Sequence, residues 1–247
     1  MNRLEGAAGR CHADDRARVF QAQVELSDEL MLSPTFAIAL SGCDLRCDFC
    51  ITGRESWNSK AGQPANIADL SREAEQALVD GARSIMILGG EPTIHLPSVL
   101  ELVAALPDHA MLVWKTNGHG TESARELLEG LFDVWVVDYK FGNDLCAHRL
   151  ARVPDYTAVV RQNLAWARAN TNLIVRHLVM PGHLDCCWRP VAEWLAWQMP
   201  EVKVNLRTGF WPAWHARRHP ELRGTVERGD AGEALRYGRS LGLNLID

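Results

Sequence analysis

Three of the seven cysteines in this 247-residue chain lie close together in the segment SGCDLRCDFCIT (residues 41–52). Cys43, Cys47 and Cys50 have the spacing C-x-x-x-C-x-x-C. A cubane iron–sulfur cluster has four irons that each take one terminal ligand, so three thiolates would leave one iron open to another molecule. Structural zinc instead takes four protein ligands. The spacing therefore favours an open cluster, and the alternatives are three buried thiols or a zinc site completed by a distant ligand.

Apolar, strand-like segments alternate with amphipathic, helix-like ones along the chain. Strands that are apolar on both faces and separated by helices form parallel sheets, so this order predicts an α/β fold. Six such units predict a barrel or partial barrel with its working residues at the strand C-termini, and a doubly wound open sheet is the alternative. The expected strands are residues 35–41, 84–88, 110–116, 133–140, 173–180 and 202–207, and the expected helices lie near 67–80, 97–106, 121–130, 156–169, 188–198 and 230–241.

Composition narrows the class of protein. The net charge of −5 gives no overall basic footprint for nucleic acid. The N-terminal residues lack the apolar core of a signal peptide, and no run of about 18 apolar residues predicts a membrane span. Cysteines without an export signal indicate a reducing compartment, so we expect a cytoplasmic protein without nucleic-acid or membrane partners. We expect an N-terminal extension over residues 1–34 and one barrel domain over 35–247.

Polar residues end several of the expected strands. LGGEP (88–92) closes the second strand, WKTNG (114–118) the third and VVDYKFGND (136–144) the fourth, and VRHLVMPGHLD (175–185) covers the fifth. Each segment alone is typical of an ordinary strand-to-helix turn. Because the C-termini of barrel strands share one face, several such segments together indicate a binding site there.

The cysteine loop after a first strand, with Phe49 directly before the last cysteine, resembles the radical S-adenosylmethionine (SAM) superfamily. The segments LSPTFAIALSGCDLRCDFC, VVDYKFGNDLCA, VPDYTAVVRQNL and LIVRHLVMPGH are similar to the glycyl-radical-enzyme activating branch. They are closer still to the group described as pyruvate formate-lyase activating enzyme-like. The resemblance runs from about Leu32 to the C-terminus and implies a partial (β/α)6 barrel of the radical SAM type.

The resemblance implies a radical SAM oxidoreductase with one [4Fe–4S] cluster and SAM as its cofactors. Reductive cleavage of SAM would yield a 5′-deoxyadenosyl radical that abstracts a hydrogen atom. The expected substrate is a protein, a glycyl radical enzyme, and the expected electron donor is a flavodoxin or ferredoxin. One alternative is an enzyme that modifies a small molecule or peptide directly, and another is a non-catalytic zinc or cluster-binding module.

The resemblance also implies roles for individual residues. Cys43, Cys47 and Cys50 would be the metal ligands, and with Lys140 they are the expected catalytic residues. Lys115 stands where the pyruvate formate-lyase activating enzyme has an Asp that helps hold a monovalent cation, so the Lys115 ammonium is expected to replace that cation beside Asp138. The expected cofactor-binding residues are Phe49, Ile51, Gly89, Gly90, Glu91, Lys115, Thr116, Asn117, Asp138, Tyr139, Lys140 and Arg176.

The other four cysteines are not expected to bind a second cluster. Cys186 and Cys187 are adjacent and lack a matching C-x-x-C, and Cys146 lies in NDLCAHRL, an expected helical turn. These three are interpreted as buried or helix-entry thiols, and the single Cys11 near the N-terminus does not predict another metal site. Residues 208–229 are expected to form a long loop, whose aromatic and arginine side chains predict either a substrate contact or a solvated surface.

Overall fold

The computed structural model describes residues 11–246, so the first ten residues of the expected N-terminal extension lie outside the described residues. Contacts between Cα atoms divide the chain into two compact units. The first unit comprises the residues up to Leu45 together with Arg54–Thr116 and Thr121–Trp135. The second unit comprises Arg46–Gly53, Asn117–Gly120 and the residues from Val136 onward.

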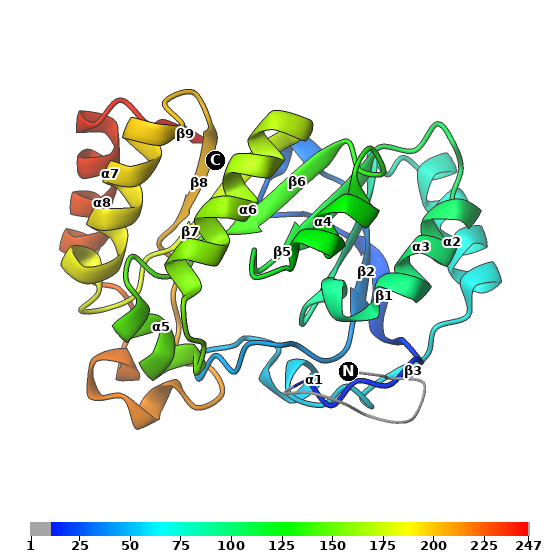
Figure 1. Ribbon diagram of the computed structural model, residues 1–247, viewed down its shortest axis with the longest axis horizontal. Coiled ribbons are helices and arrows are strands. Elements are labelled where there is room, and N and C mark those ends of the chain that lie inside the picture. The colour runs from blue at the N-terminus through cyan, green and yellow to red at the C-terminus, as the bar shows by residue number, and fades with distance from the viewer. Residues whose placement is uncertain (1–10, 247) are drawn as a thin grey trace. The chain divides into compact units, whose positions relative to one another are not determined.

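The first unit contains strands in the order β3-β1-β2-β4-β5 (Figure 1). β2, β4 and β5 are parallel, whereas β1 pairs antiparallel with both β2 and β3. Every residue of β2 is buried, as is typical of a parallel strand covered on both faces. The strands are β1 (Arg18–Glu25), β2 (Thr35–Leu40), β3 (Gln63–Pro64), β4 (Ser84–Gly89) and β5 (Leu112–Thr116).

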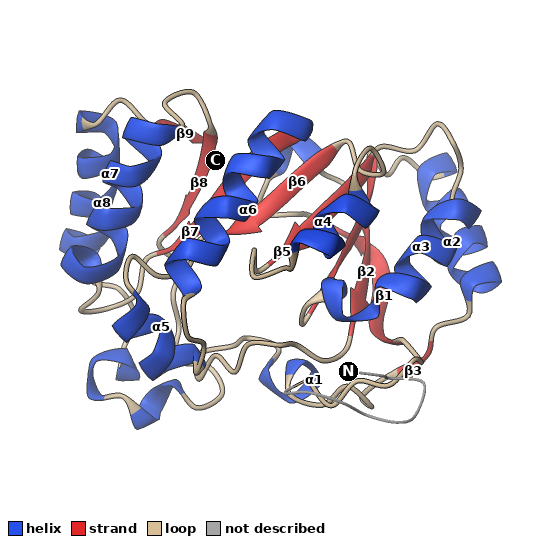
Figure 2. Ribbon diagram, in the orientation of Figure 1, coloured by secondary structure: helices blue, strands red, loops and turns tan. Residues whose placement is uncertain are grey.

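Helices alternate with the strands of the first unit along the chain, and α2, α3 and α4 lie beside these strands (Figure 2). The side chain of Asn66 accepts a hydrogen bond at the start of α2, and that of Thr121 does so at the start of α4. α2 contacts α3 and β2. The helices are α1 (Gly53–Ser56), α2 (Ile67–Val79), α3 (Leu96–Ala105) and α4 (Glu122–Leu128), with 3-10 turns at Leu30–Leu32 and Pro92–His95.

The second unit contains β6 from Val136 onward and strands β7, β8 and β9, in the order β6-β7-β8-β9, and β8 is parallel to β7 and to β9. The buried indole of Trp188 donates a hydrogen bond of 2.9 Å to the Ala234 carbonyl, which fixes α8 beside the turn that precedes α7. The strands are β6 (Val134–Asp138), β7 (Asn172–Leu178), β8 (Lys203–Arg207) and β9 (Asn244–Ile246). The helices are α5 (Asp144–Ala151), α6 (Tyr156–Asn170), α7 (Arg189–Gln198) and α8 (Arg228–Ser240), with a π-helical turn at Leu184–Trp188 and 3-10 turns at Ala216–Arg218 and Pro220–Arg223.

The predicted alternation of strands and helices is confirmed. The six expected strands correspond to β2, β4, β5, β6, β7 and β8, and the six expected helices correspond to α2, α3, α4, α6, α7 and α8. The sequence analysis missed β1, which lies within the expected N-terminal extension, and it treated α5 as a single turn. Within residues 11–246, no helix combines the length and the apolar character that a membrane crossing requires.

The end of β4 lies against the end of β2 with almost no space between their backbones. A Cβ atom at Gly89 would lie 2.1 Å from the Leu40 carbonyl oxygen, and one at Gly90 would lie 2.0 Å from the Gly42 carbonyl oxygen. The Gly90 N–H also donates to the Leu40 carbonyl at 2.9 Å. Gly89 and Gly90 are therefore required where the end of β4 packs against Leu40 and Gly42, the residues that lead into Cys43.

We expect Gly90→Ala to push the end of β4 away from the turn at Gly42. The added Cβ would meet backbone atoms, which cannot rotate aside, so the free energy of unfolding should fall by at least the usual cost of overpacking, about 1–3 kcal/mol. Urea denaturation measures this change. Gly229→Ala is the control, because a Cβ at Gly229 in α8 has nothing within 4 Å. Equal stability of the two variants would contradict this account of Gly90.

Candidate active site

In the first unit, the expected site residues lie at the C-terminal ends of three parallel strands. Cys43 follows β2 and is buried, Glu91 follows β4, and Thr116 is the last residue of β5. Because parallel strands present their C-termini at one edge, the sheet gathers these residues at the same edge. This is the edge at which the sequence predicted the site.

Glu91 joins the end of β4 to the end of β5. Its side chain is almost fully buried and accepts hydrogen bonds from the Thr93 N–H at 3.1 Å, from the Thr93 hydroxyl and from the Thr116 hydroxyl at 2.9 Å. The first of these caps the 3-10 turn at Pro92–His95. Glu91 and Thr116, both expected to contact the cofactor, thus hold each other in place.

Lys115 has a buried acidic partner in the first unit. Its Nζ lies 3.0 Å from Oε2 of Glu29, whose side chain has no exposed surface. The Ser27 hydroxyl donates to the same oxygen at 2.6 Å. The Lys115 ammonium therefore compensates a buried carboxylate from the segment before β2, a contact that the sequence analysis did not anticipate. Its expected role beside the cosubstrate stays a prediction.

In the second unit, Asp48 anchors the loop that carries Cys47 and Cys50. Its buried carboxylate accepts a hydrogen bond from Arg152 at 3.0 Å and pairs with Nε2 of His219 at 2.8 Å. Its own N–H donates to the Leu150 carbonyl at 2.9 Å, which ties the loop to α5. The sequence analysis missed this residue, although an acidic residue between two candidate metal ligands is a usable signal.

Phe49 and Ile51, both expected around the adenine, have opposite environments. Phe49 is buried, with its ring centroid 6.0 Å from that of Phe141 and 6.4 Å from that of Phe210. Ile51 is 69% exposed. Phe49 is therefore part of an aromatic cluster within the second unit, whereas Ile51 presents an open apolar surface beside Cys50.

Asp138, Lys140 and Arg176 form a charged group at the ends of β6 and β7. Lys140 pairs with Oδ2 of Asp138, and Nη1 of Arg176 lies 3.7 Å from Oδ1. Burial is the largest single influence and disfavours the charged form of Lys140. The charge of Asp138, its hydrogen bond to Lys140 and the charge of Cys47 together outweigh burial and raise the pKa of Lys140. Two cations facing one carboxylate leave a net positive charge, which suits an anionic ligand group.

Tyr139 and Asn117 each bond to another residue of the second unit. The Tyr139 side chain is fully buried and its hydroxyl accepts a hydrogen bond from Nε of Arg161 at 2.7 Å, while burial raises the pKa of Tyr139. Oδ1 of Asn117 accepts from the His119 N–H at 2.8 Å. Each of these expected cofactor contacts has an internal partner in the structure.

The Tyr156 hydroxyl holds the backbone of two residues of this charged group. Its fully buried hydroxyl accepts a hydrogen bond from the Lys140 N–H at 2.7 Å and donates to the Asp138 carbonyl at 3.3 Å. Burial raises the pKa of Tyr156 well above its ordinary value, so the hydroxyl stays protonated and keeps both roles. The segment that carries Asp138 and Lys140 is thus fixed through its backbone.

We expect Tyr156→Phe to lower the free energy of unfolding by about 1–3 kcal/mol, because it leaves the Lys140 N–H without this partner in a buried setting. Urea denaturation measures the loss. Tyr237→Phe is the matched control, since its hydroxyl bonds to Glu193 at the surface and its removal should change stability by less than about 0.5 kcal/mol. Indistinguishable losses in the two variants would refute the role of Tyr156.

His177 is a buried neutral histidine in β7. Its Nδ1 lies 2.6 Å from the Tyr139 carbonyl oxygen, to which the Nδ1–H donates. Burial lowers the pKa of His177 to about 4, although the Tyr139 carbonyl favours the protonated form. The imidazole is therefore uncharged at neutral pH.

This burial predicts a specific pH dependence of stability. Between about pH 6.5 and pH 4 the unfolded chain protonates His177 and the folded chain does not, so the free energy of unfolding should fall by about 3 kcal/mol as the pH falls through this range. His177→Asn keeps an N–H donor but does not titrate. Urea denaturation across this range should show a weaker pH dependence in the variant, and parallel curves would rule out the assignment.

A family model described as the Radical SAM superfamily matches residues 38–195, more than half of the chain. An uncharacterized protein of Methanocaldococcus jannaschii is 28% identical over 233 residues, which cover 90% of this chain and 67% of that protein. A 7-carboxy-7-deazaguanine synthase of Methanothermobacter thermautotrophicus is 33% identical over 103 residues, or 42% of this chain and 40% of that enzyme. The chain thus spans about two thirds of the first relative and less than half of the second.

Two solved structures illustrate the shared fold. SuiB of Streptococcus suis bound to the precursor peptide SuiA has a TM-score of 0.61 at 17% identity, over 83% of this chain and 46% of that one. A domain of a pyruvate-formate lyase-activating enzyme from Bacteroides vulgatus has a TM-score of 0.53 at 16% identity, over 66% of this chain and 97% of that one. Likeness at these identities extends to the fold, and it agrees with the predicted partial barrel. The chain belongs to the radical SAM superfamily, whose enzymes use a [4Fe–4S] cluster and SAM.

Proposed function

We propose that this protein is a radical SAM enzyme that modifies a small molecule or a peptide directly. The observation that carries this proposal is a set of matches to four 7-carboxy-7-deazaguanine synthases, at 32–43% identity over 24–44% of this chain. The names of these enzymes specify a small-molecule product. The sequence motifs suggested the activating-enzyme branch. The structural likeness to one such enzyme, at 16% identity, concerns the fold alone and does not distinguish this branch from others.

We assign Cys43, Cys47 and Cys50 to the cluster. Three thiols in one loop are the donor set that a cubane with one open iron takes, and none of the three is in a disulfide. When bound, the cluster and SAM together supply a radical able to abstract hydrogen. The protein contributes orientation and exclusion of water, and a reduced flavodoxin or ferredoxin would supply the electron.

The charged group in the second unit is the proposed partner of the carboxylate of SAM. Arg176 and Lys140 supply the positive charge, and Asp138 pairs with both cations. The negative charge of the Cys47 thiolate also raises the pKa of Lys140 and so favours its protonated form. Lys140 is therefore within electrostatic range of one proposed ligand of the cluster. The glycines that end β4 have a packing role, and their contact with the methionyl ammonium is part of the proposal.

The proposed function is tested by tracing the hydrogen atom that the radical abstracts from the substrate. The protein is reconstituted anaerobically, reduced, and given SAM with deuterated candidate substrates, namely fused-ring heterocycles from which a deazaguanine could be formed, and short peptides. We expect deuterium to appear in 5′-deoxyadenosine with one of these candidates. Transfer from a glycine-deuterated glycyl radical enzyme, with none from the small candidates, would favour the activating-enzyme function instead.

Variants of two buried cysteines serve as the internal comparison. Cys47→Ala removes one of three protein bonds to the cluster and should reduce SAM cleavage below detection. Cys11→Ala changes a buried thiol outside the C-x-x-x-C-x-x-C loop and should leave cleavage unchanged. Cleavage by Cys47→Ala at the rate of Cys11→Ala would exclude the cluster assignment.

A further inference from the structure

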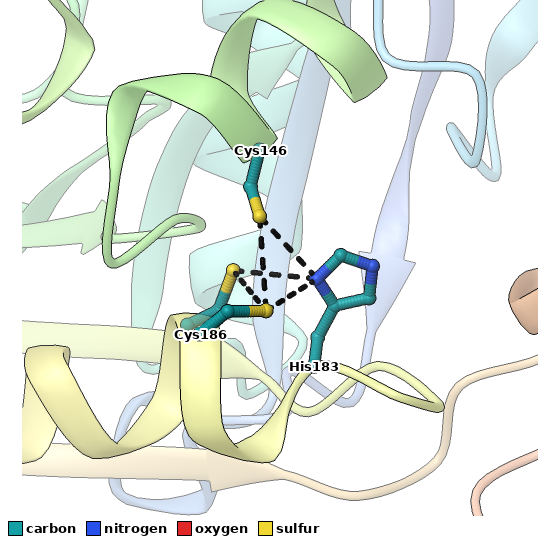
Figure 3. A group of neighbouring side chains, drawn as sticks. Cys146, His183 and Cys186 are labelled. Carbon is teal, nitrogen blue, oxygen red and sulfur yellow. Dashed lines mark hydrogen bonds between the residues drawn. The ribbon is translucent and has the colours of Figure 1, made fainter.

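Four side chains with metal-binding atoms meet in the second unit, outside the C-x-x-x-C-x-x-C loop (Figure 3). Cys146 lies in the first turn of α5, and His183, Cys186 and Cys187 lie at the π-helical turn before α7. Cys146 and Cys186 are 40 residues apart in the sequence, so packing of the two segments brings them together. The metal-binding atoms of all four residues lie within 4.8 Å of one another.

The distances between these atoms match a tetrahedral site for one metal ion. Sγ of Cys186 lies 3.7 Å from Sγ of Cys146 and 3.9 Å from Sγ of Cys187. Nδ1 of His183 lies 3.7, 3.1 and 3.5 Å from the sulfurs of Cys146, Cys186 and Cys187, respectively. Metal–ligand bonds of about 2.3 Å to sulfur and about 2.0–2.1 Å to nitrogen place tetrahedral sulfurs about 3.8 Å apart, and sulfur and nitrogen about 3.6 Å apart.

These distances identify the kind of metal site. In a cubane cluster each thiolate binds a different iron, and the cluster itself separates the sulfurs, whereas the sulfur of Cys186 is within 3.9 Å of both other sulfurs. A disulfide requires a bond of about 2.0 Å, and none of these cysteines forms one. Three thiolates and one imidazole are instead a common ligand set of structural zinc.

Neighbouring residues hold the ligands from both segments. Asn143 caps α5, and its Oδ1 accepts from the Cys146 N–H at 2.8 Å while its Nδ2 donates to the Cys186 carbonyl at 2.6 Å. The backbone at Gly142 passes so close that a Cβ there would lie 2.5 Å from the Cys187 carbonyl oxygen. One short segment therefore sets the spacing between the two halves of the site.

The outer nitrogen of His183 has a polar environment suited to a metal ligand. Nε2 lies 3.6 Å from Oε1 of Glu221 and 3.3 Å from Nη2 of Arg149, which also pairs with Glu221. Metal-bound histidines commonly direct their second N–H toward a carboxylate, and Glu221 places a carboxylate oxygen near Nε2, at 3.6 Å, which is longer than a hydrogen bond. The His183 side chain is almost fully buried, so its ring orientation is fixed.

We propose that Cys146, His183, Cys186 and Cys187 bind one zinc ion, in addition to the cluster of the C-x-x-x-C-x-x-C loop. This differs from the expectation that the three cysteines are simple thiols. The sequence signal is weak, because H-x-x-C-C supplies three ligands and the fourth is a single distant cysteine. The zinc site does not depend on which substrate the enzyme uses.

The proposed ion has a structural role in the second unit. It joins the segment before α7 to the start of α5, and the end of α5 binds the cysteine loop. There the Arg46 N–H donates to the Ala151 carbonyl at 3.0 Å, and the Asp48 N–H donates to the Leu150 carbonyl at 2.9 Å. Loss of zinc should therefore loosen the loop that carries Cys47 and Cys50.

The first test measures metals in the full chain after anaerobic reconstitution with iron and sulfide. Elemental analysis should find about one zinc per chain besides the iron of one cluster. Cys146→Ala and Cys186→Ala should each lower zinc content at least about tenfold, whereas Cys11→Ala should keep both metals. Cys43→Ala should lose iron and keep zinc, which separates this site from the cluster loop. Zinc retained by both Cys146→Ala and Cys186→Ala would overturn the proposal.

A second measurement does not depend on how the variants fold. X-ray absorption at the zinc edge of the unaltered protein should show three sulfurs at about 2.3 Å and one nitrogen at about 2.0–2.1 Å. Zinc bound by oxygen, or a zinc-free protein whose iron content corresponds to two clusters per chain, would refute the site. A Cys146–Cys186 disulfide in zinc-free protein isolated without oxygen would do the same.

Discussion

The part of the cysteine loop in the second unit depends on the contacts that the buried carboxylate of Asp48 makes with Arg152 and His219. The loop has no regular secondary structure, so side chains must fix its shape. A buried carboxylate without partners is strongly unfavourable, and Arg152 and His219 remove that penalty. His219 follows Asp48 by 171 residues, and the His215 N–H donates to the Asp48 carbonyl at 2.8 Å. One side chain thus joins the loop to α5 and to the segment before α8.

Buried polar side chains at the other strand ends also have hydrogen-bond or ion-pair partners within their own unit. Glu91 connects β4 to β5 through Thr116, Glu29 neutralises Lys115, and Tyr156 fixes the backbone around Lys140. Each group has its partner before any ligand binds, so the residues proposed to bind SAM are already oriented. Such preorganisation reduces the ordering that binding would otherwise require.

The fold and the substrate class rest on different kinds of observation. The strand order and the family match agree on a radical SAM partial barrel, yet one fold can support several chemistries. The substrate proposal therefore rests on the sequence matches to 7-carboxy-7-deazaguanine synthases, which cover less than half of this chain. The proposed zinc site is independent of both, because it follows from four side chains and the contacts that hold them.

The sequence by itself determined the six central strands, six of the helices (α2, α3, α4, α6, α7 and α8) and the loop with three candidate metal ligands, because burial patterns and spacing are local properties. It did not indicate β1 or β9, since RVFQAQVE is only half-buried and β9 has three residues, so both depend on pairing with neighbouring strands. The tertiary structure alone brought Lys115 to Glu29, His219 to Asp48, and Cys146 to His183 and Cys186. Those pairs depend on how distant segments pack, and no short window of sequence contains that information.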